Sequence, residues 1–163
     1  MNRYFSFFTR QGNLRQGESV FTSDRNLCVI LDACRYDLLL EVAGKYSFLS
    51  DPTSRISVDS ETDAWTRKTF SRANVSHLEN TTHATANPFS RQISEPANLH
   101  SIGRVWQYGR DDDDGTVLPR IVTDRAISAS RNESQDSLLA HYFSLMSHSF
   151  HRKNSSWAGK LRS

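Results

Sequence analysis

Asp32 is the residue of this 163-residue chain best placed for chemistry, because it ends an apolar run and precedes a helical pattern. Residues 27–32 read Leu-Cys-Val-Ile-Leu-Asp, which is typical of a short, fully buried strand. In open α/β sheets, ligands gather outside the carboxyl ends of strands. A carboxylate there needs a cation, a set of backbone donors or a substrate. Asp32 is therefore the first candidate functional residue.

Two hydroxyl side chains, Ser60 and Thr62, form the second candidate group. They come just before a predicted helix over residues 64–70. The simpler interpretation is capping, in which either hydroxyl accepts a hydrogen bond from the first turn. The alternative is a hydroxyl nucleophile near the positive end of a helix, where an oxyanion or phosphoryl group is also stabilised. The local pattern leaves both interpretations open.

Strands and helices alternate along the chain, which predicts an α/β fold with a mainly parallel sheet flanked by helices. The residues between them at 50–61 and 90–100 are predicted loops, and the acidic run ending at Gly115 is a predicted surface turn. The predicted strands are 27–32, a polar and weak one at 82–86, 101–108 and 138–143. The predicted helices are 37–44, closed by Gly44, then 64–70, and one from Pro119 with an apolar stripe of Val122, Ala126 and Ile127.

Composition excludes several classes of protein. The net charge is +2 and the Lys and Arg residues are scattered, so we expect no nucleic-acid partner. No apolar run approaches the ~20 residues of a membrane span, and the N-terminal apolar part is too short for a secretion signal. Cys28 and Cys34 lack the spacing of a zinc site and are expected to be thiols in the cytoplasm.

Five short motifs, taken in order, resemble sulfatase-like proteins of the alkaline phosphatase superfamily, in the form common in archaeal genomes. Together they cover about residues 27–148. They are Val29-Ile30-Leu31-Asp32-Ala33-Cys34-Arg35-Tyr36-Asp37, Ser60-Glu61-Thr62-Asp63-Ala64-Trp65, Thr85-Ala86-Asn87-Pro88-Phe89, Asp114-Gly115-Thr116-Val117-Leu118-Pro119 and Leu139-Ala140-His141-Tyr142.

The resemblance implies an alkaline-phosphatase-like fold and a metal-dependent hydrolase of phosphate or sulfate esters. It makes Asp32 a ligand of a divalent metal ion (Zn, Mn, Mg or Ca). It makes Thr62 the nucleophile, with Ser60 as the second choice. A cation held by carboxylates would lower the pKa of that hydroxyl and neutralise the oxygens of the substrate.

The family has a second set of metal ligands, including an Asp-His pair, in a C-terminal half that this chain does not contain. The expected organisation is a lead-in at 1–26, a partial sulfatase-like domain at 27–148 and a basic polar tail at 149–163. We therefore expect a truncated form with weak activity or none. The alternatives are an esterase completed by a partner chain or homodimer, and a non-catalytic module that binds an anion or a partner.

A sheet that lacks strands would have an open edge and an exposed apolar face. We therefore expect the chain to self-associate through that edge and to be poorly soluble.

Overall fold

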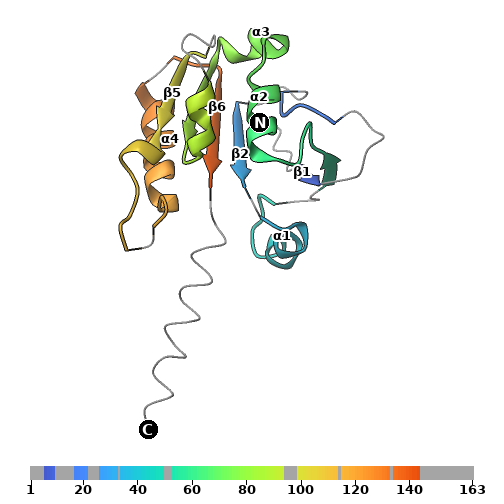
Figure 1. Ribbon diagram of the computed structural model, residues 1–163. Helices are drawn as coiled ribbons and strands as arrows, with labels where there is room; N and C mark the ends of the chain where they lie inside the picture. Colours follow the sequence, from blue (N-terminus) through green and yellow to red (C-terminus); the bar gives the residue numbers. More distant parts are fainter. Residues whose placement is uncertain are drawn as a thin grey trace.

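The computed structural model is built around a four-stranded sheet with helices on both faces (Figure 1). The strand order is β2-β6-β4-β5, and all three pairings are parallel. The predicted α/β class with a mainly parallel sheet is therefore confirmed. The strands are β2 (Leu27–Leu31), β6 (Ser137–Tyr142), β4 (Thr81–Thr85) and β5 (Ser101–Arg104). The structure describes residues 6–9, 17–21, 26–32, 34–49, 53–93, 99–113, 115–132 and 134–143.

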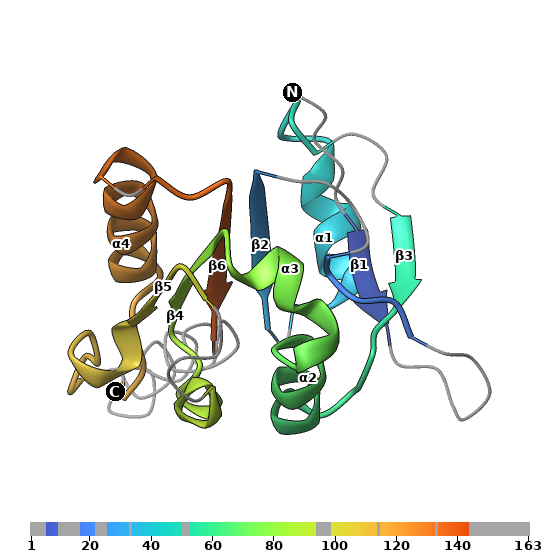
Figure 2. The same cartoon turned by 90° about the horizontal axis from the view of Figure 1, so that it is seen from above.

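Two helices cover opposite faces of this sheet. Figure 2 shows α2 (Thr62–Thr69) on one side of the strands and α4 (Pro119–Asn132) on the other. Helix α4 begins at the predicted proline, and its Val122 and Ala126 are buried as expected, but Ile127 is exposed. The remaining helical segments are α1 (Tyr36–Ala43), α3 (Val75–Leu78) and the 3₁₀ turns η1 (Arg72–Asn74), η2 (Pro88–Gln92) and η3 (Val105–Gln107).

A second, two-stranded parallel sheet pairs β1 (Ser6–Thr9) with β3 (Thr53–Ile56). The predictions of a loop over 50–61 and of an irregular or amphipathic lead-in over 1–26 are wrong where these strands occur. Each strand has four residues, and their pairing joins segments more than forty positions apart in sequence. Local patterns do not report such pairing. The predicted tail at 149–163 lies outside the described residues.

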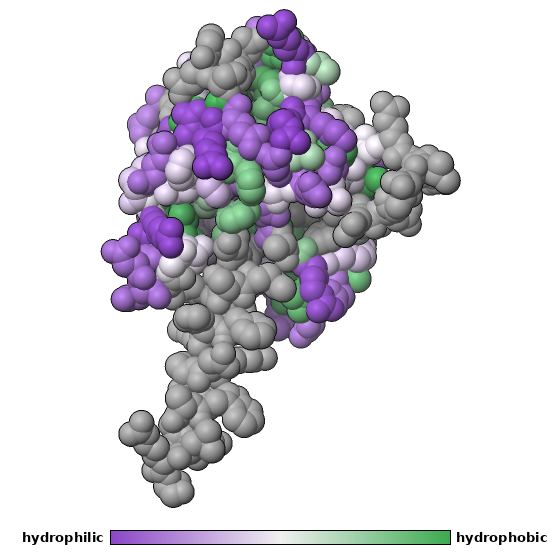
Figure 3. All heavy atoms as spheres, viewed as in Figure 1, coloured by the Kyte–Doolittle hydropathy of each residue, from purple (hydrophilic) through white to green (hydrophobic). Residues whose placement is uncertain are grey.

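The core between the sheet and α4 consists mainly of alanines, with Leu138 and the partly buried Tyr142 beside them. Ala84 of β4 and Ala140 of β6 pack with Ala126 and Ala129 of α4. Alanine leaves little side chain between a helix and a sheet, so α4 lies close to the strands. The apolar areas on the face shown in Figure 3 are small and separate, which agrees with a hydrophobic fraction of 37%.

Strand β4 is central and buried throughout, although three of its five residues are threonine. Its hydroxyls are satisfied within the described structure. Thr81 Oγ1 donates to the His77 carbonyl at 2.6 Å, Thr82 Oγ1 meets Ser101 Oγ at 3.2 Å, and Thr85 Oγ1 accepts the Asn87 N–H at 3.0 Å. Burial of these hydroxyls is tolerated because each has a partner.

Strand β2 has the predicted position, but the prediction that it is fully buried is wrong. Leu27, Val29 and Leu31 are 51%, 46% and 40% exposed, and they alternate with half-buried residues. Among the described strands β2 lies at the end of the sheet and pairs with β6 alone, whereas α4 packs over β4 and β6. One face of β2 therefore remains open.

Helix α1 follows β2 as predicted and ends at Gly44, but none of its residues is buried. Its N-cap is Arg35, which makes no side-chain capping bond. Asp37 does not cap the helix; it forms an exposed ion pair with Arg35. Its leucines do not form a buried face, because Leu38 and Leu40 are both exposed.

Candidate active site

Asp32 lies where β2 ends, at the carboxyl edge of the sheet. Its backbone N–H donates to the Tyr142 carbonyl at 3.0 Å, which extends the ladder between β2 and β6 by one residue. Its side chain is 24% exposed. The carboxylate is thus held by the end of a paired strand and still reaches solvent, as a group that meets a ligand must.

Thr62 is the first residue of α2, and its side chain meets Asp32. Thr62 Oγ1 donates to Asp32 Oδ2 at 3.2 Å. The two candidates, thirty positions apart in sequence, therefore come together as neighbours.

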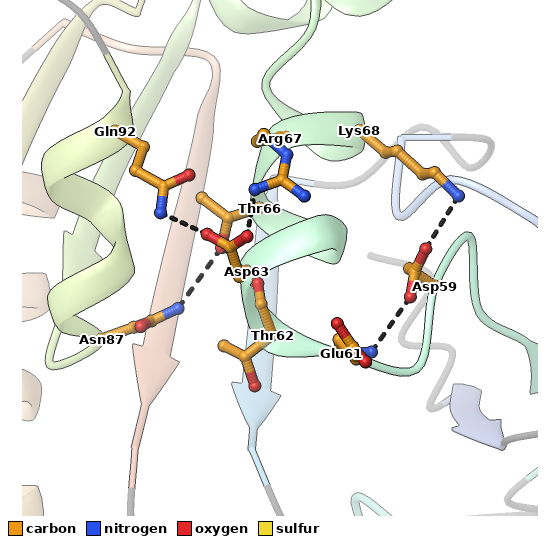
Figure 4. A network of polar contacts seen from close by, with 9 residues as sticks. All are labelled: Asp59, Glu61, Thr62, Asp63, Thr66, Arg67, Lys68, Asn87 and Gln92. Atoms are coloured by element: carbon orange, nitrogen blue, oxygen red, sulfur yellow. Dashed lines mark hydrogen bonds and ion pairs between the residues drawn. The ribbon is translucent and has the colours of Figure 1, made fainter.

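Neither predicted capping hydroxyl caps α2. The N-cap is Glu61, and it makes no side-chain capping bond. Asp59 instead organises the approach to the helix, because its Oδ1 accepts the N–H groups of Ser60 at 2.7 Å and Glu61 at 3.1 Å. Figure 4 shows that Asp59 is also bonded to Lys68 and that this pair lies apart from the Thr62 side chain. Ser60 is exposed, so the structure separates the two hydroxyls: Thr62 contacts Asp32, and Ser60 lies on the surface.

His141 is a third member of this site, and residue-type reasoning did not single it out. Its Nε2 lies 3.5 Å from Asp32 Oδ2, the same oxygen that accepts the Thr62 hydroxyl. The imidazole is 1% exposed. The signal was present in the sequence as a histidine two residues before the end of the last predicted strand. The position of His141 beside Asp32 follows from the register between β2 and β6, in which His141 pairs with Ile30, two residues before Asp32.

His83 of β4 lies beside His141 on the same face of the sheet. Thr85 is the register partner of His141, so His83, two positions earlier, points the same way. The two rings are stacked, with centroids 5.9 Å apart and planes 19° apart. All four ring nitrogens are buried, and none has a hydrogen-bond partner among the residues that the structure describes. Burial, with the nearby His141 and Arg104, holds the pKa of His83 well below its usual value, so this ring is neutral at pH 7.

Aromatic residues of α2 and its C-terminal end cover the two imidazoles. Trp65 packs edge-on against His141, with centroids 5.5 Å apart. Phe70, the residue that ends α2, stacks on His83 at 4.8 Å. Trp65 is one turn after Thr62, so a single helix face supplies both the hydroxyl and the cover over the histidines.

Asp63 is next to Thr62 but belongs to a different network, on the side of α2 that faces η2. Its carboxylate is bonded to Arg67 and Gln92, as Figure 4 shows. The hydrogen bond from Gln92 and the contacts with Arg67 hold the pKa of Asp63 below its usual value. A further link joins Asn87 Nδ2 to Thr66 Oγ1 at 3.5 Å. These contacts hold α2 to η2 and thereby hold Thr62 in place.

The described residues do not complete a metal site. Asp32, His141 and the Thr62 hydroxyl converge, but within the ranges that the structure describes no three His, Cys, Asp or Glu residues gather where they could hold an ion. Catalytic cations usually take about three or more protein ligands. One carboxylate and one imidazole are too few.

Comparison of the chain with protein-family models, curated proteins and solved structures found no match. Among the described residues, no helix is long and apolar enough to cross a membrane. The site is therefore interpreted from its own geometry.

Proposed function

We propose that this chain is a sulfatase-like hydrolase of phosphate or sulfate esters with weak activity, in which Thr62 is the nucleophile. The resemblance makes Asp32 a ligand of a divalent metal ion, and we propose that Asp32 also acts as the base of Thr62. The observation that carries the proposal is the hydrogen bond from Thr62 Oγ1 to Asp32 Oδ2 at 3.2 Å. A hydroxyl next to a general base is the arrangement that nucleophilic catalysis requires. The alkaline-phosphatase-like fold belongs to the same proposal.

The chemical step uses groups that are already in contact. The Thr62 hydroxyl loses its proton to Asp32, and its oxygen forms a bond to the phosphorus or sulfur of the ester. The bond to the ester oxygen breaks, and the leaving oxygen takes a proton from water. A water oxygen then bonds to the phosphorus or sulfur as the bond to Thr62 Oγ1 breaks. Thr62 regains its proton from Asp32, and the proton lost by this water neutralises the hydroxide left by protonation of the leaving oxygen. The N-terminal amides of α2 lie beside Thr62 and favour the negative charge of the transferred group.

The proposal is tested by hydrolysis of p-nitrophenyl phosphate and p-nitrophenyl sulfate, each without metal and with Zn²⁺, Mn²⁺, Mg²⁺ or Ca²⁺. We expect weak turnover that falls to background in Thr62→Val, because the nucleophile is gone. Asp32→Asn should lower kcat by about 10²–10⁴-fold, the usual contribution of a positioned base.

Two variants serve as controls. Thr62→Ser keeps a hydroxyl and should retain turnover, and Ser60→Ala should match the wild type because Ser60 lies on the surface. Turnover in Thr62→Val equal to that of the wild type would overturn the proposal. Loss in Ser60→Ala alone would move the nucleophile to that residue.

A second candidate function is a non-catalytic module that binds an anion or a partner. It is favoured by the small number of ligands that converge at Asp32, since two do not hold a catalytic cation. Absence of turnover in every metal, together with sulfate or phosphate binding that Thr62→Val abolishes, would support this candidate over the hydrolase.

We also propose that the chain self-associates through β2 and resides in the cytoplasm. Support for the first is the position of β2 at the end of the sheet, with three exposed apolar side chains on one face. Support for the second is that Cys28 and Cys34 are thiols rather than a disulfide, the state that a reducing compartment maintains. Cell fractionation tests the location.

A further inference from the structure

His141 is a buried histidine beside the Asp32 carboxylate, at the carboxyl edge of the sheet. His141 is 1% exposed, and within the described part of the chain neither ring nitrogen has a hydrogen-bond partner. A buried polar group without a partner costs free energy, because it has lost its hydrogen bonds to water. Such a group in a native structure calls for an explanation. For His141 a charged group lies close by, since Asp32 Oδ2 is 3.5 Å from Nε2.

We propose that His141 is a positioning residue that directs the Asp32 carboxylate toward Thr62, with the Nε2–H of the imidazole facing Asp32 Oδ2. The inference rests on the proposed function, because it concerns the same carboxylate. One oxygen, Oδ2, lies within 3.2 Å of the Thr62 hydroxyl and 3.5 Å of the imidazole. A donor behind that oxygen favours the side-chain rotamer in which it also meets Thr62.

Asp32 needs such support, because its carboxylate is at the end of the outermost strand. It is 24% exposed, and a carboxylate that reaches solvent has other rotamers in which water replaces protein contacts. A geometry loosened by about 1 Å can cost on the order of 10²-fold in rate.

The imidazole is itself held firmly. Trp65 packs edge-on against it at 5.5 Å, and His83 stacks on its other side at 5.9 Å. Trp65 and Thr62 are on the same helix, so α2 fixes both the ring and the hydroxyl relative to one carboxylate oxygen. Phe70, which ends α2, stacks in turn on His83. The two histidines therefore lie between two aromatic rings that both come from α2 and its end.

The fold supplies a matched control for this residue. His83 is buried to the same extent as His141, is stacked on it and likewise has no hydrogen-bond partner among the described residues. It differs in being one strand farther from β2, since the strand order is β2-β6-β4. The same change at the two histidines therefore separates a role in the ring stack from a role toward Asp32.

The kinetic arm compares three variants with the wild type. His141→Phe keeps an aromatic ring between Trp65 and His83 but removes Nε2, and we expect kcat to fall about 10- to 100-fold with KM within about twofold. His83→Phe should leave kcat within about twofold. His141→Gln retains an amide donor near the position of Nε2 and should recover part of the lost kcat.

Equal losses in His141→Phe and His83→Phe would overturn the inference, because they would assign the effect to the ring stack. Unchanged kcat in a folded His141→Phe would overturn it as well. A loss of kcat that His141→Gln does not relieve would also count against it.

A second arm does not depend on turnover, so it distinguishes failure of this inference from failure of the proposed hydrolase. The ¹⁵N spectrum of imidazole-labelled wild-type protein reports which nitrogen of His141 carries the proton. We expect the proton on Nε2, and a change in the Nε2 resonance in Asp32→Asn that the His83 resonances do not share. A proton on Nδ1, or a His141 spectrum that Asp32→Asn leaves unchanged, would overturn the inference even in an active enzyme.

Discussion

One oxygen of Asp32 contacts two groups that come from different parts of the chain. Thr62 reaches it from the first turn of α2, and His141 reaches it from β6. Asp32 and Thr62 could be selected from the sequence because an acid at the end of a strand and a hydroxyl before a helix are local patterns. His141 could not be selected in the same way. Its role depends on strand register, which places residues more than a hundred positions apart side by side.

The depressed pKa of His83 predicts how stability depends on pH. Folded His83 remains neutral, whereas in the unfolded chain it takes up a proton below its usual pKa of 6.5. Its contribution to stability is therefore present above about pH 6.5 and is lost as the pH falls, by up to about 1.4 kcal/mol per pH unit for one proton.

His83→Phe should remove this part of the pH dependence. Urea unfolding at intervals from pH 8 to pH 5 measures it: the free energy of unfolding should decrease less steeply below pH 6.5 in the variant than in the wild type. Between pH 7.5 and 8 the two curves should run parallel. Identical slopes at acid pH would show that His83 accepts a proton in the folded state.

The start of α2 is set by the loop before it rather than by a capping side chain. Asp59 is bonded to Lys68 at 2.8 Å and to two backbone N–H groups of the approach. The hydrogen bond from Lys68, followed by that from the Glu61 N–H, lowers the pKa of Asp59 to about 2. Because the folded state favours the charged carboxylate, its contribution is present above about pH 4 and is lost toward pH 2.

Lys68→Met should raise the pKa of Asp59 toward its usual 3.8 and leave the Asp63 carboxylate largely unaffected. Carboxyl ¹³C NMR titration measures both groups in one experiment. Lys45→Met, at an exposed lysine after α1, provides the control. An Asp59 pKa that stays near 2 in Lys68→Met would mean that the backbone donors alone hold it there.

The turn before α4 depends on Gly115, which has φ of +64° and closes on the Asp111 carbonyl at 2.8 Å. Gly115→Ala should cost about 1 kcal/mol, because a side chain disfavours this left-handed conformation. Steric contact adds little, since the nearest atom to an added Cβ is 3.9 Å away. Gly115→Asn should cost less, because asparagine tolerates this region. Urea unfolding compares the two, and equal losses would argue for crowding instead.

Helices and strands with strong local signals were predictable. The proline at the start of α4, Gly44 at the end of α1 and the apolar residues of β2 each predicted the element in which they lie. The polar strand β4 was predicted only weakly, because the partners that satisfy its threonines lie on other elements. The pairing of β1 with β3 was not predicted for a related reason: the local sequence of a strand does not indicate which distant segment it pairs with.

At the scale of the whole molecule, the sheet is covered unevenly. Strands β4 and β6 are packed beneath α4, whereas Leu27, Val29 and Leu31 of β2 remain exposed. The parallel order of the sheet followed from the alternation of elements. The strand at the end of the sheet could not be predicted in the same way, because strand order depends on crossover connections that local sequence patterns do not reveal.

Self-association through β2 should weaken when its open face becomes polar. The double variant Leu27→Thr/Val29→Thr keeps residues suited to a strand while removing apolar surface, and we expect a smaller mass in light scattering at the same concentration. Tyr108→Thr removes an apolar side chain that is 63% exposed elsewhere, and it should leave the mass unchanged. A monomeric wild type would contradict the proposal directly.

The alanines between α4 and the sheet have a consequence for engineering this chain. The usual way to strengthen a polar core is to introduce larger side chains, but at Ala84, Ala126 or Ala140 an added methylene would push the helix outward. The hydrogen bond between Thr123 Oγ1 and the Tyr142 hydroxyl, at 2.8 Å, spans that gap and would be strained first. Stabilising substitutions should therefore be sought on the exposed side chains of α1, such as Leu38 and Leu40.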